Sequence, residues 1–439
     1  MHGIGSGVAC RRTHAPAGAK AAGRFTPLKA AAFIVGLLLG PVSAPAPAEV
    51  TPGETPRIDH GARPPEETVT WRLEERWRIG GDEEEVIIGS VRDAAVDQAG
   101  NLYLLDGRLA QVLVYSPEGE LLRTLGREGE GPGEFRMPLD LELFPDGRIG
   151  VCQPMPGKIV FLDRAGNPAG SLEAGGSDPT AGGIGFFDEI QARGDHLVVA
   201  GRQLKRSGQG FDRRRYLAAL DPQGQESVRF LDESAPDRIV SGRYVEREEY
   251  FVTDGGWAMG PDGRVYAAPE RDRYAIHVYE PDGTPARVVT REFRPWKRTA
   301  EEKGRVGEGL LVMVNGRRVE IEAEAEDHDP CIVGMHVAPD GELWVLNSRS
   351  TRDQPEGIFQ TYDVFASDGR FVRQVALACP GDPQQDRLFP LDGRRMLLVP
   401  NAREADRLGP GRDAAEAADE EPASLQVICY EVAGTGPGD

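Results

Sequence analysis

The sequence predicts an all-β protein, a six-bladed β-propeller of four-stranded antiparallel blades that an N-terminal strand closes. Two observations lead to this prediction: a hairpin unit that recurs six times, and a strand-like segment left over near the N-terminus. The composition agrees, because the 439 residues include 55 Gly and 34 Pro. That abundance suits many short strands joined by tight turns better than long helices.

The recurring unit is a run of alternating apolar and polar residues, a turn that ends in Gly, and a second alternating run. In residues 145–147, 261–263 and 339–341 the turn is Pro-Asp-Gly. Proline presets φ at the first turn position, Asp bonds back to the backbone, and Gly takes the positive φ. A second turn and a fourth apolar segment follow in most copies, which gives the four strands of a propeller blade. Separations of 47, 47, 69, 78 and 52 residues lie between the six turn glycines, Gly100, Gly147, Gly194, Gly263, Gly341 and Gly393.

The last unit has only three strands of its own, at residues 387–390, 396–399 and 425–432. Residues 70–79 alternate like a strand and precede the first full unit. Pairing this segment with the last unit would close the ring and remove its exposed edges. We therefore expect a propeller over residues 69–434, after a polar, Pro-rich linker at 49–68 and before a tail at 435–439.

The connection between the first two units carries a more specific pattern. Residues 126–138 (GREGEGPGEFRMP) combine a Gly-rich loop, a Pro-Gly-x-Phe sequence and a Pro that opens the next inner strand. This segment resembles the blade-to-blade connection of NHL-repeat propellers, whereas the later units share only the architecture. The resemblance implies a six-bladed ring. It implies no single activity, because that family includes extracytoplasmic binding scaffolds, protein- and RNA-binding modules and a few enzymes.

Residues 1–48 have the features of a signal peptide. They contain five basic residues and no acidic one, an apolar run of ten at 30–39, and an Ala-Pro-Ala cleavage pattern at 46–48. The run is shorter than the roughly 20 residues that a membrane span takes. We expect export to the periplasm or the extracellular space; the alternative is an uncleaved N-terminal membrane anchor.

Loss of residues 1–48 would move the formal net charge from −20 to −25, because five positive charges leave with them. So acidic a surface repels nucleic-acid phosphates and anionic lipid heads. We therefore expect no nucleic-acid partner, and no membrane span once the signal peptide is removed.

Three segments interrupt the repeat, at residues 202–215, 290–330 and 402–423. The first is basic (RQLKRSGQGFDRRR), the second contains a capping-box pattern at 299–302 that predicts a short helix, and the third is acidic and Ala-rich. Extra loops in a repeat protein tend to mark its binding face. Arg202, Arg213 and Arg214 are thus candidates for contact with an acidic partner; pairing with the chain's own carboxylates is the alternative.

An aspartate opens the inner strand in four units. If a closed ring brought these residues together at its central tunnel, their oxygens would suit Ca²⁺ better than a transition metal. The alternative is that each Asp accepts backbone N–H groups of a neighbouring strand and so fixes the blade spacing. The four candidates are Asp93, Asp140, Asp188 and Asp386.

A second set of polar residues follows the second strand of each unit, where loops reach one face of the ring. Asp106, Glu270 and Asn347 in this set have the residue types with which gluconolactonase-type propellers hold a divalent metal, although the surrounding motifs of that family are missing. The sequence therefore favours an exported scaffold that binds a protein, a peptide or a glycan. A divalent-metal-dependent hydrolase of gluconolactonase-like type is the alternative. The full set is Asp106, Gln153, Arg202, Glu270, Asn347 and Asn401.

Overall fold

A computed structural model describes residues 55–81, 86–174, 183–208, 210–239, 242–253, 255–307, 312–314, 317–319, 321–407 and 424–437. Residues 50–439 form one compact unit. The expected signal peptide lies outside the described residues. Within the described part of the chain, no helix combines the length and the apolar composition that a membrane crossing requires.

Four antiparallel sheets each contain four consecutive strands. The first holds β3 (Val91–Val96), β4 (Leu102–Asp106), β5 (Gln111–Tyr115) and β6 (Leu121–Leu125). The second holds β7 (Asp140–Leu143), β8 (Ile149–Gln153), β9 (Lys158–Leu162) and β10 (Pro168–Glu173). The third holds β11 (Ile184–Arg193), β12 (His196–Ser207), β13 (Gly210–Leu220) and β14 (Glu226–Pro236). The fourth holds β16 (Trp257–Met259), β17 (Val265–Ala267), β18 (Ala275–Tyr279) and β19 (Pro285–Arg291).

A fifth sheet has eight strands in the order β23-β24-β25-β26-β2-β29-β28-β27. One half consists of β23 (Ile332–Val337), β24 (Leu343–Asn347), β25 (Ile358–Phe365) and β26 (Phe371–Ala378). The other consists of β2 (Val69–Gly80), β27 (Arg387–Pro390), β28 (Arg395–Val399) and β29 (Gln426–Pro437).

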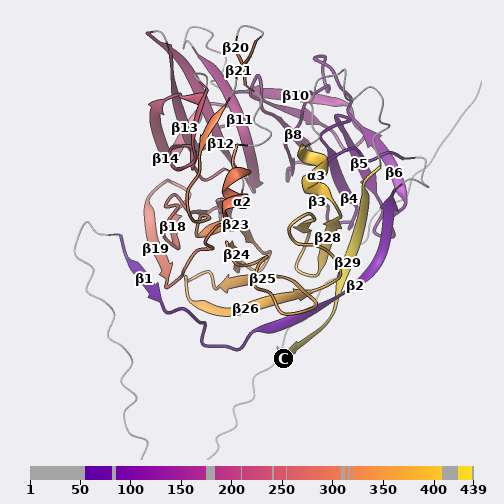
Figure 1. Ribbon diagram of the computed structural model, residues 1–439. Coiled ribbons are helices and arrows are strands. Elements are labelled where there is room, and N and C mark those ends of the chain that lie inside the picture. Colours follow the sequence, from indigo (N-terminus) through magenta and orange to yellow (C-terminus); the bar gives the residue numbers. More distant parts are fainter. Residues whose placement is uncertain are drawn as a thin grey trace, which may run out of the picture. The chain divides into compact units, whose positions relative to one another are not determined.

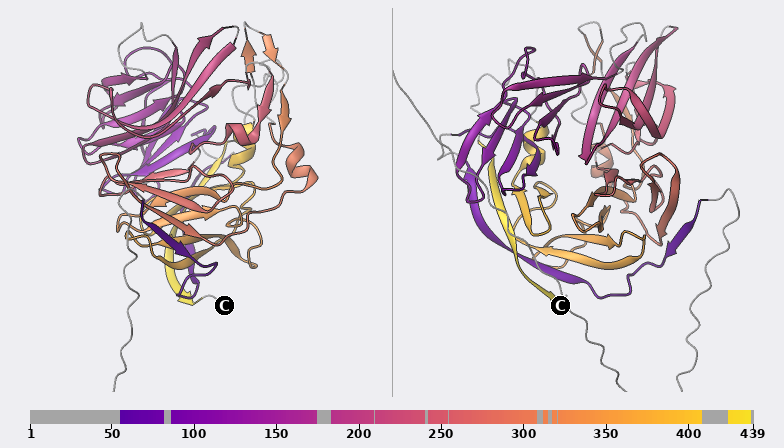
Figure 2. Two further views of the ribbon diagram at one scale, coloured as in Figure 1. Left: turned by 90° about the vertical axis from the view of Figure 1, so that its left-hand side faces the viewer. Right: turned by 180° about the vertical axis from the view of Figure 1, so that it is seen from behind.

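The sheets are arranged around a central axis, as in a β-propeller (Figures 1 and 2). Their first strands contact one another in succession, β3 with β7, β7 with β11, β11 with β16, and β16 with β23. Six separate blades were predicted, but the described residues form three four-stranded sheets, a fourth to which β1 adds a fifth strand, and one continuous sheet of eight. The physical reason is that β2 pairs on both edges, antiparallel with β29 and, over Val69–Arg72, parallel with β26.

Residues 55–80, here called the strap, follow the outer rim of the sheets (Figure 1). Its first strand, β1 (Arg57–His60), pairs in parallel with β19, the outermost strand of the fourth sheet. The His60 Nε2 atom lies 2.9 Å from the carbonyl oxygen of Gly369, and its ring contacts Phe365 and Phe371. The predicted linker at 49–68 therefore includes a strand docked on the propeller. The predicted tail at 435–439 is likewise corrected, because β29 continues to Pro437.

The inserted segments also differ from expectation. Residues 202–215 lie within the hairpin of β12 and β13, as continuations of its strands and not as an added loop. Within 290–330, Thr299 and Glu302 form the predicted capping box, and α2 (Ala300–Gly304) begins there. In the third segment, α3 (Ala402–Arg407) is present, and residues 408–423 lie outside the described residues.

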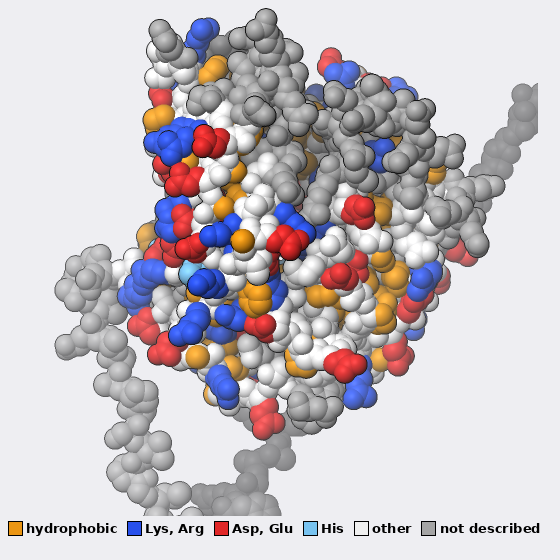
Figure 3. All heavy atoms as spheres, in the orientation of Figure 1, with side chains coloured by type: hydrophobic (Ala, Val, Ile, Leu, Met, Phe, Trp, Pro, Cys, Tyr) orange, Lys and Arg blue, Asp and Glu red, His pale blue; other side chains and the backbone are white. Residues whose placement is uncertain are grey.

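Ion pairs of Arg298 connect the second insertion to α1 and join two parts of the insertion to each other. Arg298 pairs with Glu246 in α1 (Glu246–Glu249) and, at 2.5 Å, with Asp329. Residues Glu322–Glu324 (β22) pair with Arg243–Val245 (β15), while β20 (Val312–Val314) and β21 (Arg317–Val319) form a separate two-stranded sheet. Figure 3 shows basic and acidic side chains interspersed on the visible face of the molecule.

The Gly-rich connection at 126–138 places Phe135 in the core between the first two sheets, where it is 0% exposed. Gly126 has a φ of +72°, and a Cβ added there would lie 2.5 Å from the Phe135 ring. Glycine is required on both counts, since other residues are strained at positive φ and the ring fills the space. The motif thus inserts an aromatic plug between two neighbouring sheets.

The plug makes a direct prediction. Phe135→Ala should lower the free energy of unfolding by about 3–5 kcal/mol, as complete removal of a buried aromatic ring does. Met137→Ala in the same connection is the control, because its side chain is exposed, and should change stability by about 0.5 kcal/mol or less. Urea denaturation measures both. Equal effects of the two substitutions would show that the motif does not anchor the sheets.

Candidate functional site

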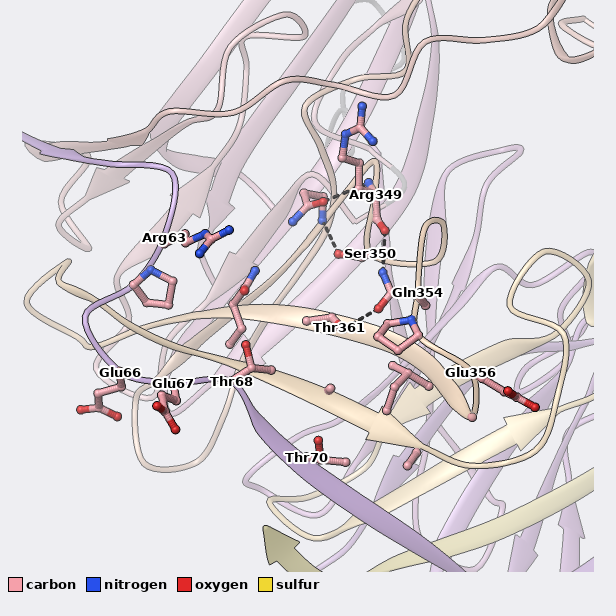
Figure 4. Close-up of a pocket in the computed structure, with 18 of the residues that line it drawn as sticks. Arg63, Glu66, Glu67, Thr68, Thr70, Arg349, Ser350, Gln354, Glu356 and Thr361 are labelled. Atoms are coloured by element: carbon pink, nitrogen blue, oxygen red, sulfur yellow. Dashed lines mark hydrogen bonds between the residues drawn. The ribbon is translucent and has the colours of Figure 1, made fainter. Parts of the chain in front are cut away.

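A pocket of about 1000 Å³ lies between the strap and the sheet that contains β24, β25 and β26. We call it the strap pocket. Strap residues 63–72 form one wall, and the loop between β24 and β25 forms another. β26 contributes Gln374, Ala376 and Ala378, and the end of β19 contributes Arg291 and the neighbouring Phe293. Figure 4 shows that the two walls present side chains from segments nearly 300 residues apart in sequence.

A buried polar network surrounds Asp363 beneath this pocket. The Asp363 carboxylate is 0% exposed and accepts hydrogen bonds from Tyr274 Oη at 2.9 Å, Asn347 Nδ2 at 2.8 Å and Gln374 Nε2 at 2.8 Å. Arg291 Nη1 lies 2.5 Å from Asp363 Oδ1, the oxygen that also accepts Gln374, whereas Tyr274 and Asn347 donate to Oδ2. Burial, followed by the Asp363 charge, raises the pKa of Tyr274 well above its ordinary value, which keeps this phenol a donor. A buried carboxylate needs such complete pairing.

The Arg291 side chain is surrounded by aromatic rings and by Asp363. Its side chain is 7% exposed, and its guanidinium lies 5.0 Å from the Tyr274 ring centroid, 5.3 Å from that of Phe293 and 4.9 Å from that of Phe371. These distances are within the range of cation–π attraction. The Nε atom is buried without a hydrogen-bond partner. The aromatic rings and Asp363 therefore fix a positive charge at the base of the pocket before any ligand arrives.

The loop between β24 and β25 is fixed by its own hydrogen bonds. Ser350 Oγ accepts the backbone N–H of Asn347 at 2.9 Å, and the Ser350 carbonyl accepts that of Thr361. Gln354 Oε1 accepts the Thr361 hydroxyl at 2.6 Å, while its Nε2 donates to the carbonyls of Arg349 and Arg352 (Figure 4). The polar wall is consequently preorganised.

The strap brings charges to the opposite wall. Arg63 and Arg72 line the pocket and are exposed, and neither forms an ion pair with any residue that the structure describes. Glu66 and Glu67 also line it. In Figure 4 these two carboxylates extend away from Ser350, Gln354 and Thr361, whereas the Arg63 guanidinium extends toward them.

Among the predicted loop residues, only Asn347 lines this pocket. Asp106 is buried and accepts four backbone N–H groups, those of Gly89, Ser90, Arg108 and Leu109, at 2.8 to 3.1 Å. It therefore organises its own loop.

Two further loop candidates are occupied within the chain. Arg202 pairs with Asp188 at 3.1 Å and lies over the Phe186 ring. Glu270 pairs with Arg273 at 2.7 Å and lies 3.0 Å from His277.

The four inner-strand aspartates do not converge. Asp93 accepts the backbone N–H of Leu141 in the next sheet at 3.0 Å, and Asp140 accepts that of Ile190 in the sheet after it at 2.6 Å. Asp188 pairs with Arg202, and Asp386 accepts the backbone N–H of Asp382 and that of Asn401, which follows β28. Among the described residues, no group of three His, Cys, Asp or Glu side chains could hold a metal ion. Asp93 and Asp140 thus follow the sheet-spacing alternative.

Burial raises the pKa of Asp93 and, together with the charge of Asp93, raises that of Asp140 well above its ordinary range. The two side chains hydrogen-bond to each other, so a protonated Asp140 donates to Asp93. Burial also raises the pKa of Glu142 to about 7, against the opposing charge of Arg193, which lies 3.1 Å away.

The basic segment of the third sheet is internally paired. Arg213 has a side chain that is 5% exposed and pairs with Glu249 and, at 3.9 Å, with Asp237. Arg214 is more exposed and pairs with Asp232 at 2.9 Å and Glu226 at 3.3 Å. The structure therefore shows both arginines engaged by the chain's own carboxylates, the alternative left open by the sequence.

Sequence reasoning missed most of the strap pocket. Asp363 carried the clearest signal, since it is a charged residue inside the otherwise apolar run 362–365. A buried carboxylate of this kind needs partners, and their presence could have been predicted though not their identity. Arg63 and Arg72 gave no local signal, because their role depends on where the strap docks.

No protein-family profile and no curated protein matches this chain. Among solved structures, a DUF4221-family protein of Bacteroides vulgatus is similar at 9% identity and a TM-score of 0.45, over 85% of this chain and 99% of that one. The calcium-binding protein regucalcin of Agrobacterium tumefaciens is similar at 12% identity and a TM-score of 0.40, over 84% and 97%. Virginiamycin B lyase of Staphylococcus aureus is similar at 9% identity and a TM-score of 0.36, over 73% of this chain and 80% of that one. Likenesses this distant say nothing about ligand or activity.

The shared proton of Asp93 and Asp140 predicts a pH dependence of stability. Carboxyl groups whose pKa is raised by folding stabilise the protein when protonated, and this contribution is lost as the pH rises through the folded-state pKa. Stability should therefore fall between pH 5 and 8. Asp140→Asn keeps the acceptor for Ile190 and a donor to Asp93 without the charge. It should raise the free energy of unfolding at pH 8, where the native Asp140 would otherwise be driven to ionise beside Asp93, and so flatten the dependence of stability on pH.

Denaturation at pH 5, 6, 7 and 8 measures this slope. Asp146→Asn is the control, because Asp146 lies in an exposed turn beside Arg148 and its pKa is lowered. His336 does not titrate in this window, since burial lowers its pKa to about 4. An unchanged slope in Asp140→Asn would refute the shared proton.

The internal pairing predicts unequal costs for two neighbouring arginines. Arg213→Ala leaves the carboxylates of Glu249 and Asp237 largely buried without their cation, and should destabilise the protein by about 3–5 kcal/mol. Arg214→Ala should cost about 1 kcal/mol or less, as expected for a solvent-screened pair. Urea denaturation distinguishes them. If Arg213→Ala lowers the free energy of unfolding as little as Arg214→Ala does, the buried ion pair of Arg213 does not stabilise the fold.

Proposed function

We propose that this protein is an exported β-propeller binding module whose ligand site is the strap pocket. The observation that carries the proposal is the preorganised polar wall of this pocket. Asn347, Ser350, Gln354 and Thr361 are held by bonds inside the protein, so a ligand meets groups already in place. Preorganisation of this kind reduces the entropy lost on binding.

The binding role has more support than the metal-dependent hydrolase. A gluconolactonase-like site needs carboxylate and amide ligands around an open metal position. Asp106 instead accepts four backbone N–H groups, and Asn347 donates to Asp363. Glu270 pairs with Arg273 and His277. Asp106 and Glu270 thus have partners that account for their positions, and neither lines the strap pocket with Asn347.

We also propose that the eight-stranded sheet represents two blades, which makes a six-bladed ring closed by β2. The pairing of β2 with β29 over residues 69–80 supports this count. The Phe135 plug supports a relation to NHL-repeat propellers. Export rests on the signal-peptide features of residues 1–48, with cleavage after Ala48.

Filling the pocket tests the function. Thr68→Trp places a large ring at the strap wall and should abolish binding of any ligand found by screening glycan and peptide libraries. Thr124→Trp is the matched control, because Thr124 is exposed on β6 and does not line the pocket. Both variants should keep the melting temperature of the parent. A ligand that binds Thr68→Trp as well as the parent would place the binding site elsewhere.

A further inference from the structure

We infer that the strap pocket recognises an acidic saccharide, in which a carboxylate engages the strap arginines and the ring hydroxyls engage the polar wall. This inference rests on the proposed binding role of the pocket and adds the chemical class of its ligand.

The first argument is that two arginines without an ion pair to any described residue line the same pocket. The chain has 71 acidic and 51 basic residues, and most described arginines are paired with carboxylates. Arg63 and Arg72 are exceptions among the described residues, and both line the same pocket. In Figure 4 the Glu66 and Glu67 carboxylates are directed away from the polar wall, and the Arg63 guanidinium is directed toward it.

The second argument is the geometry that a guanidinium favours. Its planar array of N–H donors matches a carboxylate in a bidentate arrangement and strengthens each hydrogen bond by charge. Arg291 adds a fixed positive charge at the base, already shared with Asp363. An anion in the pocket thus meets Arg291 at the base and two strap arginines that form no ion pair with a described residue, although Glu66, Glu67 and Glu356 line the same pocket.

The third argument concerns the rest of the lining. Hydroxyl and amide side chains stand on both walls, and they suit a ligand with many hydroxyl groups. The apolar lining consists of Phe293, Ile358 and several Pro and Ala side chains. At about 1000 Å³ the pocket is at the upper end for small-molecule sites, which leaves room for more than one sugar ring. The polar lining is Thr68, Thr70, Asn347, Ser350, Gln354, Thr361 and Gln374.

The backbone of the walls argues against an extended peptide. A peptide that adds to a sheet needs a free strand edge. Residues 69–72 of β2 are already paired with β26 on one side and β29 on the other. On the facing wall, the Thr361 N–H donates to Ser350 and the Ile358 N–H donates to Pro355. Recognition here therefore depends on side chains, as in binding of a saccharide.

Titration calorimetry with uronic-acid oligosaccharides tests the inference. The panel comprises one- to four-residue oligomers of galacturonate, glucuronate, mannuronate and guluronate, each with its methyl ester as an uncharged ligand of the same shape. We expect at least one acid to bind, its ester to bind at least tenfold more weakly, and binding of the acid to weaken as salt rises. Arg63→Ala with Arg72→Ala should weaken the acid at least tenfold and leave the ester unchanged.

Arg57→Ala is the control, because Arg57 lies on the same strap, pairs with Asp59 and does not line the pocket. It should bind like the parent. If no acid in the panel binds, or if acid and ester bind equally, the charge inference is wrong. The proposed function survives this result if a different ligand binds the parent protein and no longer binds Thr68→Trp. If no such ligand is found, the proposed function fails together with the charge inference. Displacement of the acid by inorganic sulfate at equal concentration would show a general anion site and would also overturn carboxylate recognition.

Discussion

Strand β2 is hydrogen-bonded to β29 along its length and to β26 over its first four residues. The rest of the described architecture depends on this double pairing. It joins residues near the start of the propeller to strands more than 300 positions later, and it leaves neither edge of the shared segment open. An unpaired edge strand is a template for aggregation, so the same contacts that shape the sheet also protect it. The strap extends this constraint outward, because β1 covers the edge of the fourth sheet.

The acidic composition imposes a second constraint. Carboxylates in such excess repel one another, and the structure distributes them around arginines in short networks. Glu246 is one centre, since it pairs with both Arg271 and Arg298 at 2.8 Å or less and so holds the 290–330 insertion. Asp93 and Asp140 avoid mutual repulsion in another way, because a proton between the two carboxyl groups removes one of their charges. Both solutions place charge compensation inside the fold.

Local sequence predicted local structure well. The Pro-Asp-Gly turns, the capping box at Thr299 and the Phe135 connection are each determined by a few adjacent residues, and each is present. Five of the six turn glycines have a positive φ, between 58° and 91°, and only Gly393 departs from the pattern. The strap was misjudged because β1 has a polar, Pro-flanked sequence without strand periodicity. Its conformation comes from β19, which lies more than 200 residues away.

The candidate site could also be predicted only in part from local sequence. Asn347 was identified because it occupies a repeat position, but its partner Asp363 and the cation Arg291 occupy positions that no other unit shares. A sequence repeat predicts the structural features that all units share. A binding site in a repeat protein depends instead on residues that occur in a single unit. The relevant signal is therefore a polar residue that breaks an apolar strand.

A pocket built in this way couples binding to architecture. One wall belongs to the strap and the other to the β24–β26 region, so a ligand that contacts both binds only when the strap is docked. Such a ligand stabilises the docked state by RT ln(1 + [L]/Kd), about 2.7 kcal/mol at a concentration 100 times Kd. Because β2 continues directly from the pocket wall into its pairing with β29, this stabilisation acts on the junction between these two strands. Ligand occupancy and resistance to unfolding at that junction are consequently linked through a single stretch of chain, residues 63–80.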